Sequence, residues 1–284
     1  MNKALWPSRL VRSDPDDLTL RSEGRFSPPT QGITIFTGRY GSGKTETAIN
    51  YALMLAQASR EESRVRDAPA IGPLNSDARP LPAVFLIDLD IVTPYFRSRE
   101  VAEALQGSGV SVIAPAIEGQ YLDLPAIAPQ ILGTIQQRER PVILDVGGDR
   151  QGARALGQYS AAIGLHRPEG RLNLHFVVNP FRPFTDTLDG LGGSIAEIEA
   201  SSRLRVTSLV SNPNLMGETT AETILKGQRD VERFSKALRL PIAFVCVERR
   251  WTTRSVAQGQ ASPLLASLNH PVLILDRHFA MPWE

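Results

Sequence analysis

Residues 38–45 constrain the fold of this chain more than any other segment. They read Gly-Arg-Tyr-Gly-Ser-Gly-Lys-Thr and fit the phosphate-loop (P-loop) pattern G-x-x-x-x-G-K-[ST]. Glycines let backbone N–H groups approach phosphate oxygens closely, and the positive end of the helix that follows such a loop adds to the attraction. We expect Lys44 to reach the β- and γ-phosphates of a nucleotide and the Thr45 hydroxyl to bind Mg²⁺.

The segments on either side of this loop have the character that the motif requires. Residues 31–36 read as a short β-branched strand, and residues 45–56 carry apolar side chains at helical spacing. Strand, glycine loop and helix in this order favour a phosphate-binding loop over a Gly-rich turn in an ordinary α/β protein, which is the alternative.

The composition is that of a globular chain without a disulfide framework. Of 284 residues, 42% are hydrophobic and 21% are charged, and the net charge is +1. This leaves ample material for a core and gives no bulk charge that favours nucleic acid or a membrane surface. The one cysteine, Cys246, lies in an apolar run and is expected in the core, and the four histidines show no ligand spacing. Without a long apolar run or a signal-peptide core, a cytoplasmic protein is expected.

Strand-like and helix-like segments alternate along most of the chain. Strands are expected at 31–36, 83–88, 110–113, 141–145, 173–178, 205–210, 242–247 and 272–275, and helices at 45–56, 97–105, 124–138, 152–165, 193–202 and 220–238. The pattern predicts an α/β fold: a single P-loop NTPase domain over 31–284, with a mostly parallel sheet of about seven or eight strands and helices on both faces. Residues 1–30 are expected to be a flexible extension, and residues near 59–82 a polar loop.

Three acidic residues stand at strand ends where a phosphate site needs them. Asp145 ends the strand 141–145 and is predicted to orient the water shell of Mg²⁺; the alternative is a helix N-cap. The Gly-Gly-Asp that follows, 147–149, could form a segment that senses a γ-phosphate. Asp88 and Asp90 end the strand 83–88, and their alternation places both side chains on one side, where one could contact the metal shell and the other position a water; a turn-forming role is the alternative.

Together these segments resemble the deviant P-loop ATPases of the ParA/MinD type, and more closely a bacterial branch of ATP-binding proteins in that superfamily. The stretches that carry the resemblance are Gly-Ser-Gly-Lys-Thr-Glu (41–46), Asp-Leu-Asp-Ile-Val-Thr-Pro-Tyr-Phe-Arg-Ser-Arg-Glu (88–100), Asp-Val-Gly-Gly-Asp (145–149) and Asn-Pro-Phe-Arg-Pro-Phe-Thr (179–185). The resemblance spans residues from about 32 to 250.

The resemblance implies roles for particular residues. Asp90 matches the aspartate that helps to activate water, and Asp145 matches the second-switch aspartate. Asn212 matches an asparagine that hydrogen-bonds adenine, for which an amide offers both donor and acceptor; a plain Asn-Pro-Asn turn is the alternative. Arg39 and Tyr40 replace the lysine of the superfamily pattern and the glycine after it, so a nucleotide-bridged homodimer is uncertain and Arg39 is either a charged finger or a solvated residue.

The predicted site follows from these assignments. The predicted catalytic residues are Lys44, Asp90 and Asp145, and the predicted metal ligands are Thr45, Asp88 and Asp145. The predicted nucleotide-binding residues are Gly38, Arg39, Tyr40, Gly41, Ser42, Gly43, Lys44, Thr45, Glu46 and Asn212.

The function expected from the sequence is a Mg²⁺-dependent ATPase that acts as a nucleotide-gated switch for an unidentified protein partner, with slow hydrolysis by in-line attack of water. GTP is disfavoured because no Asn-Lys-x-Asp element is present. The alternative is an ATP-dependent small-molecule kinase or ligase on the same scaffold, for which Arg97, Arg99 and Arg182 could contact an anionic substrate. Neither a basic C-terminal surface nor a terminal amphipathic helix indicates a nucleic-acid or membrane partner.

Overall fold

The computed structural model describes residues 31–66, 83–90, 105, 107–113, 124–137, 139–166, 170–252 and 262–278. The predicted N-terminal extension over 1–30, the later part of the predicted loop near 59–82, and Arg97 and Arg99 all lie outside these ranges.

The described chain is a single α/β domain built on an eight-stranded sheet in which all neighbours are parallel. The strand order is β3-β2-β4-β1-β5-β6-β7-β8. The strands are β1 (Ile33–Thr37), β2 (Val84–Leu89), β3 (Val110–Ile113), β4 (Val142–Val146), β5 (Leu172–Val178), β6 (Ser208–Ser211), β7 (Ile242–Glu248) and β8 (Val272–Leu275). This sheet confirms the predicted fold class and strand count. Parallel strands rich in Val, Ile and Leu are typical of a sheet whose two faces are both covered.

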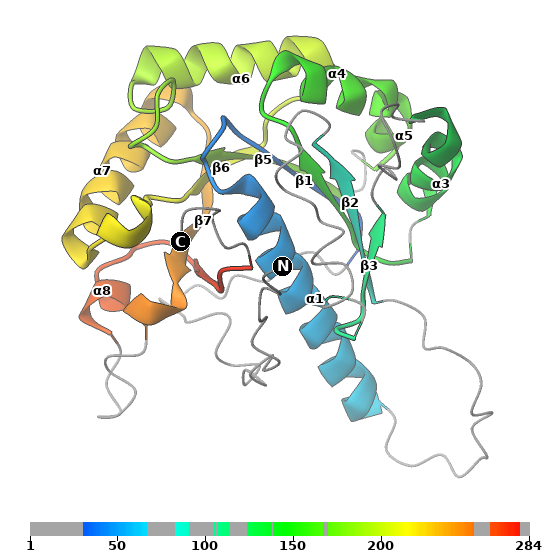
Figure 1. Ribbon diagram of the computed structural model, residues 1–284, viewed down its shortest axis with the longest axis horizontal. Coiled ribbons are helices and arrows are strands. Elements are labelled where there is room, and N and C mark those ends of the chain that lie inside the picture. Colours follow the sequence, from blue (N-terminus) through cyan, green and yellow to red (C-terminus); the bar gives the residue numbers. More distant parts are fainter. Residues whose placement is uncertain are drawn as a thin grey trace, which may run out of the picture.

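Helices cover both faces of the sheet (Figure 1). They are α1 (Lys44–Arg66), α3 (Leu124–Gln136), α4 (Arg150–Gln158), α5 (Ser160–Gly164), α6 (Leu188–Ser202), α7 (Ala221–Leu238) and α8 (Pro263–Ala266). Helix α1 lies on one face, and α3 to α7 form an arc over the other. None of the helices in the described ranges combines the length and the apolar character that crossing a bilayer requires.

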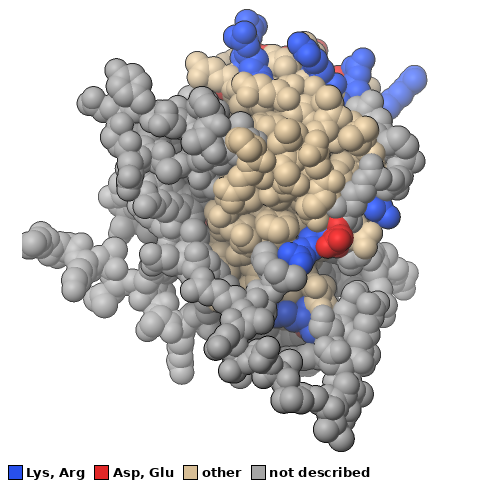
Figure 2. Space-filling view, turned by 90° about the vertical axis from the view of Figure 1, so that its right-hand side faces the viewer, with Lys and Arg blue, Asp and Glu red and all other residues tan. Residues whose placement is uncertain are grey.

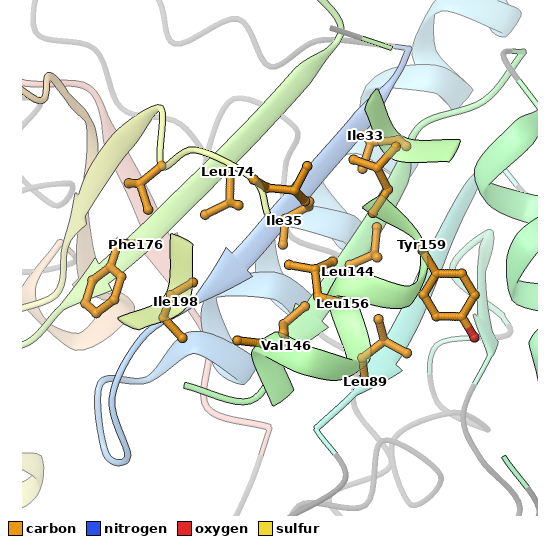
Figure 3. Close-up of a cluster of buried hydrophobic side chains, with 14 of the residues drawn as sticks. Ile33, Ile35, Leu89, Leu144, Val146, Leu156, Tyr159, Leu174, Phe176 and Ile198 are labelled. Atoms are coloured by element: carbon orange, nitrogen blue, oxygen red, sulfur yellow. The ribbon is translucent and has the colours of Figure 1, made fainter. Parts of the chain in front are cut away.

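Strand alternation divides the core into two layers. Ile33 and Ile35 of β1 pack toward the arc of helices with Leu144, Leu156 and residues of similar character (Figure 3). On the opposite face, Phe36 meets Tyr51 of α1 edge to face, with ring centroids 5.2 Å apart. This second layer also contains Cys246, so the prediction of a buried cysteine is confirmed. Burial raises the pKa of its thiol to about 12.

Several helix boundaries differ from the sequence prediction. Helix α1 continues to Arg66, so residues 59–66 are helical rather than part of a polar loop; this stretch is rich in Arg, Glu and Ser and contains neither Gly nor Pro to end the helix. The segment predicted as one helix over 152–165 is divided between α4 and α5 at Tyr159. Helix α6 begins earlier than predicted, because the Thr187 hydroxyl caps its first turn by accepting a hydrogen bond from the Gly190 N–H at 3.2 Å.

Candidate phosphate-binding site

The glycine loop lies in the middle of the sheet, after β1, with β4 on one side and β5 on the other. Gly43 has a φ of 83°, a conformation that only glycine adopts without strain. A Cβ atom on Gly43 would lie 2.3 Å from the Asn212 Nδ2, so a side chain here would also displace a neighbour. The conformation and the packing both require the glycine that the motif specifies.

Two predicted catalytic residues are in contact. The Lys44 Nζ donates to the Asp90 Oδ2 at 2.5 Å, and the two side chains are 10% and 6% exposed. Asp90 directly follows β2, and its N–H donates to the Asp88 Oδ1 at 2.9 Å. The end of β2 therefore presents its carboxylates to the first residue of α1.

The predicted metal ligands Thr45 and Asp145 are also in contact. The Thr45 hydroxyl donates to the Asp145 Oδ2 at 2.6 Å, while the Asp145 Oδ1 is buried and makes no hydrogen bond with any described residue. Asp88 is the register partner of Asp145 on the neighbouring strand. The helix-capping alternative applies to a different residue: Asp149 caps α4, its Oδ1 accepting from the Gly152 N–H at 2.7 Å.

The charges in this cluster shift the pKa values of two of its members. Burial alone lowers the pKa of Lys44, but the negative charges of Asp145, Asp90 and Asp88 outweigh that effect and raise it above the ordinary value. Burial also raises the pKa of Asp145, and Lys44 and the Thr45 hydroxyl only partly oppose this. Lys44 is thus held charged, whereas Asp145 needs further positive charge to be fully stabilised as a carboxylate.

The residues fit a hydrated Mg²⁺ ion. Mg²⁺ usually takes one or two protein oxygens and keeps several waters, and the Thr45 hydroxyl with the unpartnered Asp145 Oδ1 supplies that donor set. Among the described residues, no group of three or more His, Cys, Asp and Glu side chains could form a metal cage of its own. A site that relies on substrate phosphates for its remaining ligands is consistent with this.

Two of the other predicted nucleotide-binding residues, Arg39 and Glu46, have partners elsewhere in the chain. The Arg39 guanidinium pairs with Glu197 at 2.7 Å, donates to the Ser194 Oγ at 2.8 Å and lies over the Phe184 ring. The Glu46 carboxylate accepts from the His278 N–H at 2.9 Å. Tyr40 is 75% exposed, and the Ser42 Oγ is buried and makes no hydrogen bond within the described ranges. Their predicted contacts with a nucleotide stay predictions.

Asn212 lies at the end of β6, directly against the loop. Its side-chain Nδ2 donates to the Ser42 carbonyl at 2.7 Å, and the residue is 4% exposed. Because a carbonyl can only accept, this bond fixes which end of the amide is the nitrogen. The Asn212 Oδ1 then remains as an acceptor that makes no hydrogen bond within the described chain.

Three residues outside the predicted site list contact the site. The sequence analysis placed Gly148 in a phosphate-sensing segment and gave Arg182 a role only in the alternative function, and it assigned no role to Glu197. A Cβ atom on Gly148 would lie 1.7 Å from the Gly38 carbonyl oxygen, so the segment after β4 packs directly on the loop. Arg182 lies against Gly41, and Glu197 of α6 joins Arg39 to Arg150. Arg182 lies in the stretch 179–185, which carries part of the family resemblance, whereas no local pattern pointed to Glu197.

Charge on the outer face next to α3, α4 and α5 is uneven. Figure 2 shows Lys and Arg side chains mainly along the uppermost edge, where Figure 1 places α4 and α6, and few acidic side chains between them. Below that edge most of the described surface in this view is uncharged, with a few further basic side chains and one acidic patch that lies beside a basic one.

No protein-family model matches the sequence, and no curated protein is significantly similar to it. Among solved structures, the chain is similar to the signal recognition particle receptor FtsY from Elizabethkingia anophelis (17% identity, TM-score 0.44, 77% of this chain and 59% of that chain). It is also similar to the cell division protein FtsY from Thermotoga maritima (16% identity, TM-score 0.47, 82% and 67%) and to FlhF complexed with GMPPNP and Mg²⁺ (13% identity, TM-score 0.40, 81% and 69%).

The chain spans 59% of the length of the first of these proteins, about three fifths. None of the three carries the name of a ParA/MinD-type ATPase, and that resemblance stays a prediction. At these identities and scores the likeness carries no conclusion about nucleotide or partner, which must come from the geometry of the site.

Proposed function

We propose that this chain binds ATP with Mg²⁺, hydrolyses it slowly, and acts as a switch whose nucleotide state sets its affinity for a protein partner. The observation that carries the proposal is the convergence of Lys44, Thr45 and Asp145 beside the ends of β1 and β4, with one buried Asp145 oxygen that no described residue hydrogen-bonds. A glycine loop, a lysine, a hydroxyl and a metal-orienting carboxylate form the set on which phosphoryl transfer depends.

The orientation of the Asn212 amide supports adenine over guanine. Its Nδ2 is committed to the Ser42 carbonyl, so the Oδ1 is the end available to a base. Where the 6-position of the base faces this oxygen, adenine donates from its 6-amino group, whereas guanine presents its 6-oxo group, which is itself an acceptor; guanine could donate only from N1 or the 2-amino group, in a different pose. Leaving two acceptors opposed in a buried site is costly, which favours ATP.

Hydrolysis in this proposal begins with an exchange of partners at Lys44. The ammonium group leaves the Asp90 carboxylate, with which it pairs at 2.5 Å, and binds phosphate oxygens. Asp90 is then free of that ion pair and can orient the attacking water. Lys44 balances the negative charge that develops in the transition state.

A path from this exchange to the surface runs through β4. Gly148 packs on the Gly38 carbonyl, and the next residue, Asp149, caps α4. Helix α4 lies against α6, whose Glu197 pairs with Arg39 of the loop and, at 3.6 Å, with Arg150 of α4. A shift of the loop would therefore move both helices. The partner in this proposal binds the surface that α4 and α6 form.

The decisive test of nucleotide binding uses Lys44→Ala. Wild-type protein is expected to bind ATP in a Mg²⁺-dependent manner in isothermal titration calorimetry, and the variant to bind at least about tenfold more weakly, since it loses a charge-assisted contact. Wild-type affinity and wild-type hydrolysis in Lys44→Ala would refute the proposal.

The choice of base is tested by the ratio of ATP to GTP affinity. Wild-type protein is expected to prefer ATP by about tenfold or more, and Asn212→Ala to bring the ratio close to one. A wild-type protein that binds GTP more tightly than ATP would contradict the role given to the Asn212 Oδ1.

The partner is tested by recovery from cell extract with Asp90→Ala protein held in the ATP state, compared with wild-type protein bound to ADP. A protein enriched by the ATP state alone is the expected result. Equal recovery by both states would argue against nucleotide-gated binding.

A further inference from the structure

The turn after β5 holds an arginine against the glycine loop. The Asn179 carbonyl accepts from the Arg182 N–H at 3.1 Å and from the Thr185 hydroxyl at 2.7 Å, and the Asn179 Oδ1 accepts from the Phe181 N–H at 3.2 Å. Asn179 and Thr185 are both fully buried, at 1% and 0% exposed. Prolines at 180 and 183 restrict the backbone further. The position of Arg182 is thus set by a rigid turn.

The same turn contains backbone strain. Phe184 has a φ of 67°, in the left-handed region that a bulky side chain rarely adopts. Its carbonyl accepts from the Ser194 Oγ at 3.5 Å, and its 64% exposed ring stacks under the Arg39 guanidinium. Strain of this kind persists where the surroundings determine the conformation, and it is concentrated at ligand-binding segments.

The Arg182 guanidinium lies at the loop and pairs with none of the residues that the structure describes. A Cβ atom on Gly41 would lie 3.1 Å from its Nε, and Gly41 itself has a φ of 74°. The Nε is buried and makes no hydrogen bond, and Arg182 forms no ion pair with any described residue. A buried donor on a permanently charged group is costly to leave unsatisfied. The group that would satisfy it is an anion on the loop.

The acids near the loop do not supply that anion. Asp90 pairs with Lys44, Asp145 accepts from Thr45, and Glu197 pairs with Arg39. The arginine within the loop is therefore turned away toward α6, whereas the arginine from the β5 turn faces the loop.

We propose that Arg182 is a phosphate-binding residue supplied by the chain's own β5 turn, contacting the β- or γ-phosphate oxygens of the nucleotide bound at the loop. This inference rests on the proposed nucleotide binding and adds a residue and a charge to it. Guanidinium groups suit this role because they remain charged and match phosphate oxygens with paired donors.

The test measures the dissociation constants of ATP, ADP and adenosine for Arg182→Ala and Arg182→Lys, with Arg229→Ala on the exposed face of α7 as the matched control. Arg182→Ala is expected to weaken ATP and ADP binding by about ten- to a hundredfold and to leave adenosine binding unchanged. Arg182→Lys should recover part of the loss, and Arg229→Ala should match the wild type.

Melting of the nucleotide-free proteins separates ligand binding from structural support. Arg182→Ala is expected to keep the wild-type melting temperature without nucleotide and to show a smaller increase when ATP is added. ATP affinity within about threefold of wild type, an equal loss for adenosine, or a nucleotide-free melting temperature lowered by more than about 4 °C would overturn the proposal. Lys44→Ala serves as the reference. If both Lys44→Ala and Arg182→Ala bind ATP like wild type, the proposed nucleotide binding at the loop is refuted. If only Lys44→Ala binds ATP weakly, the role of Arg182 alone is refuted.

Discussion

Replacing Asp90 by asparagine should weaken the fold and strengthen nucleotide binding at the same time. In this structure Asp90 is the hydrogen-bonded partner of Lys44, at 2.5 Å and with both side chains at most 10% exposed. If phosphate must take Lys44 from Asp90, any stability that the pair gives to the nucleotide-free protein opposes binding. Removing the carboxylate removes that opposition.

The size of the effect follows from burial and from the remaining charges. Breaking a buried ion pair typically costs about 3–5 kcal/mol when the other charge is left uncompensated. Here Asp145 and Asp88 remain close to Lys44, so the expected loss of unfolding free energy is smaller, about 1–3 kcal/mol. If about 1.4 kcal/mol of this no longer opposes binding, affinity rises about tenfold.

The assay is calorimetric titration of ADP into Asp90→Asn in the presence of EDTA, so that metal binding does not enter, together with urea unfolding of the nucleotide-free protein. Asp88→Asn is the matched control, because it removes a negative charge from the same strand end without removing the hydrogen bond between Lys44 and Asp90; a smaller gain in affinity is expected. Unchanged or weaker ADP binding by Asp90→Asn would show that Lys44 does not exchange partners.

Three further outcomes are expected. Burial lowers the pKa of His175 to about 4. Since the unfolded chain takes up this proton near pH 6.5 and the folded chain does not, the free energy of unfolding should fall by about 3 kcal/mol between pH 6.5 and 4. Acid titration of His175→Gln should lack this pH-dependent loss of stability. Gly148→Ala should abolish ATP-induced thermal stabilisation, because its Cβ would lie 1.7 Å from the Gly38 carbonyl oxygen, whereas Gly193→Ala, with nothing within 4 Å, should not. Glu197→Gln should cost at most about 1 kcal/mol in urea unfolding, because its pairs are partly exposed.

The elements that the sequence predicts well are those whose environment is uniform along their length. Strands β4 and β8 are buried along their whole length in a sheet covered on both faces, so the unbroken Val, Ile and Leu of residues 142–144 and 272–275 identify them. Helix α6 is harder, because Gly190, Gly192 and Gly193 lower its intrinsic propensity while tertiary packing against α4 stabilises it. The break at Tyr159 has no Pro, and the nearest glycine, Gly157, lies inside the last turn of α4 rather than after it.

The site divides along a similar line. That Thr45 and Asp145 should meet could be predicted, because the carboxyl ends of neighbouring parallel strands lie at one edge of the sheet. The partners of Arg39 and Arg182 could not, since each contact joins the loop to a residue more than a hundred positions away on a different element. Such contacts depend on how helices and turns pack over the sheet, and no local periodicity encodes that.

Some of the contacts that hold the loop would change when a nucleotide binds and others would not. This difference determines which side of the loop should move on binding. The bond from Asn212 to the Ser42 carbonyl uses a backbone oxygen that phosphate has no reason to displace. The Lys44–Asp90 pair and the unpartnered Asp145 oxygen are the contacts that phosphate and metal would change. Both belong to the ends of β2 and β4 rather than to β6.

Binding should therefore leave the β6 side of the loop in place and alter the β4 side. That side continues through Gly148 and Asp149 into α4, where Arg150 meets Glu197. Glu197 of α6 also pairs with Arg39 of the loop. Helix α6 is therefore connected to the loop directly through Arg39 and indirectly through Arg150 of α4, so a change at one of these pairs would alter the other. The α4–α6 layer is thus the part of the described surface best placed to report the nucleotide state to a partner.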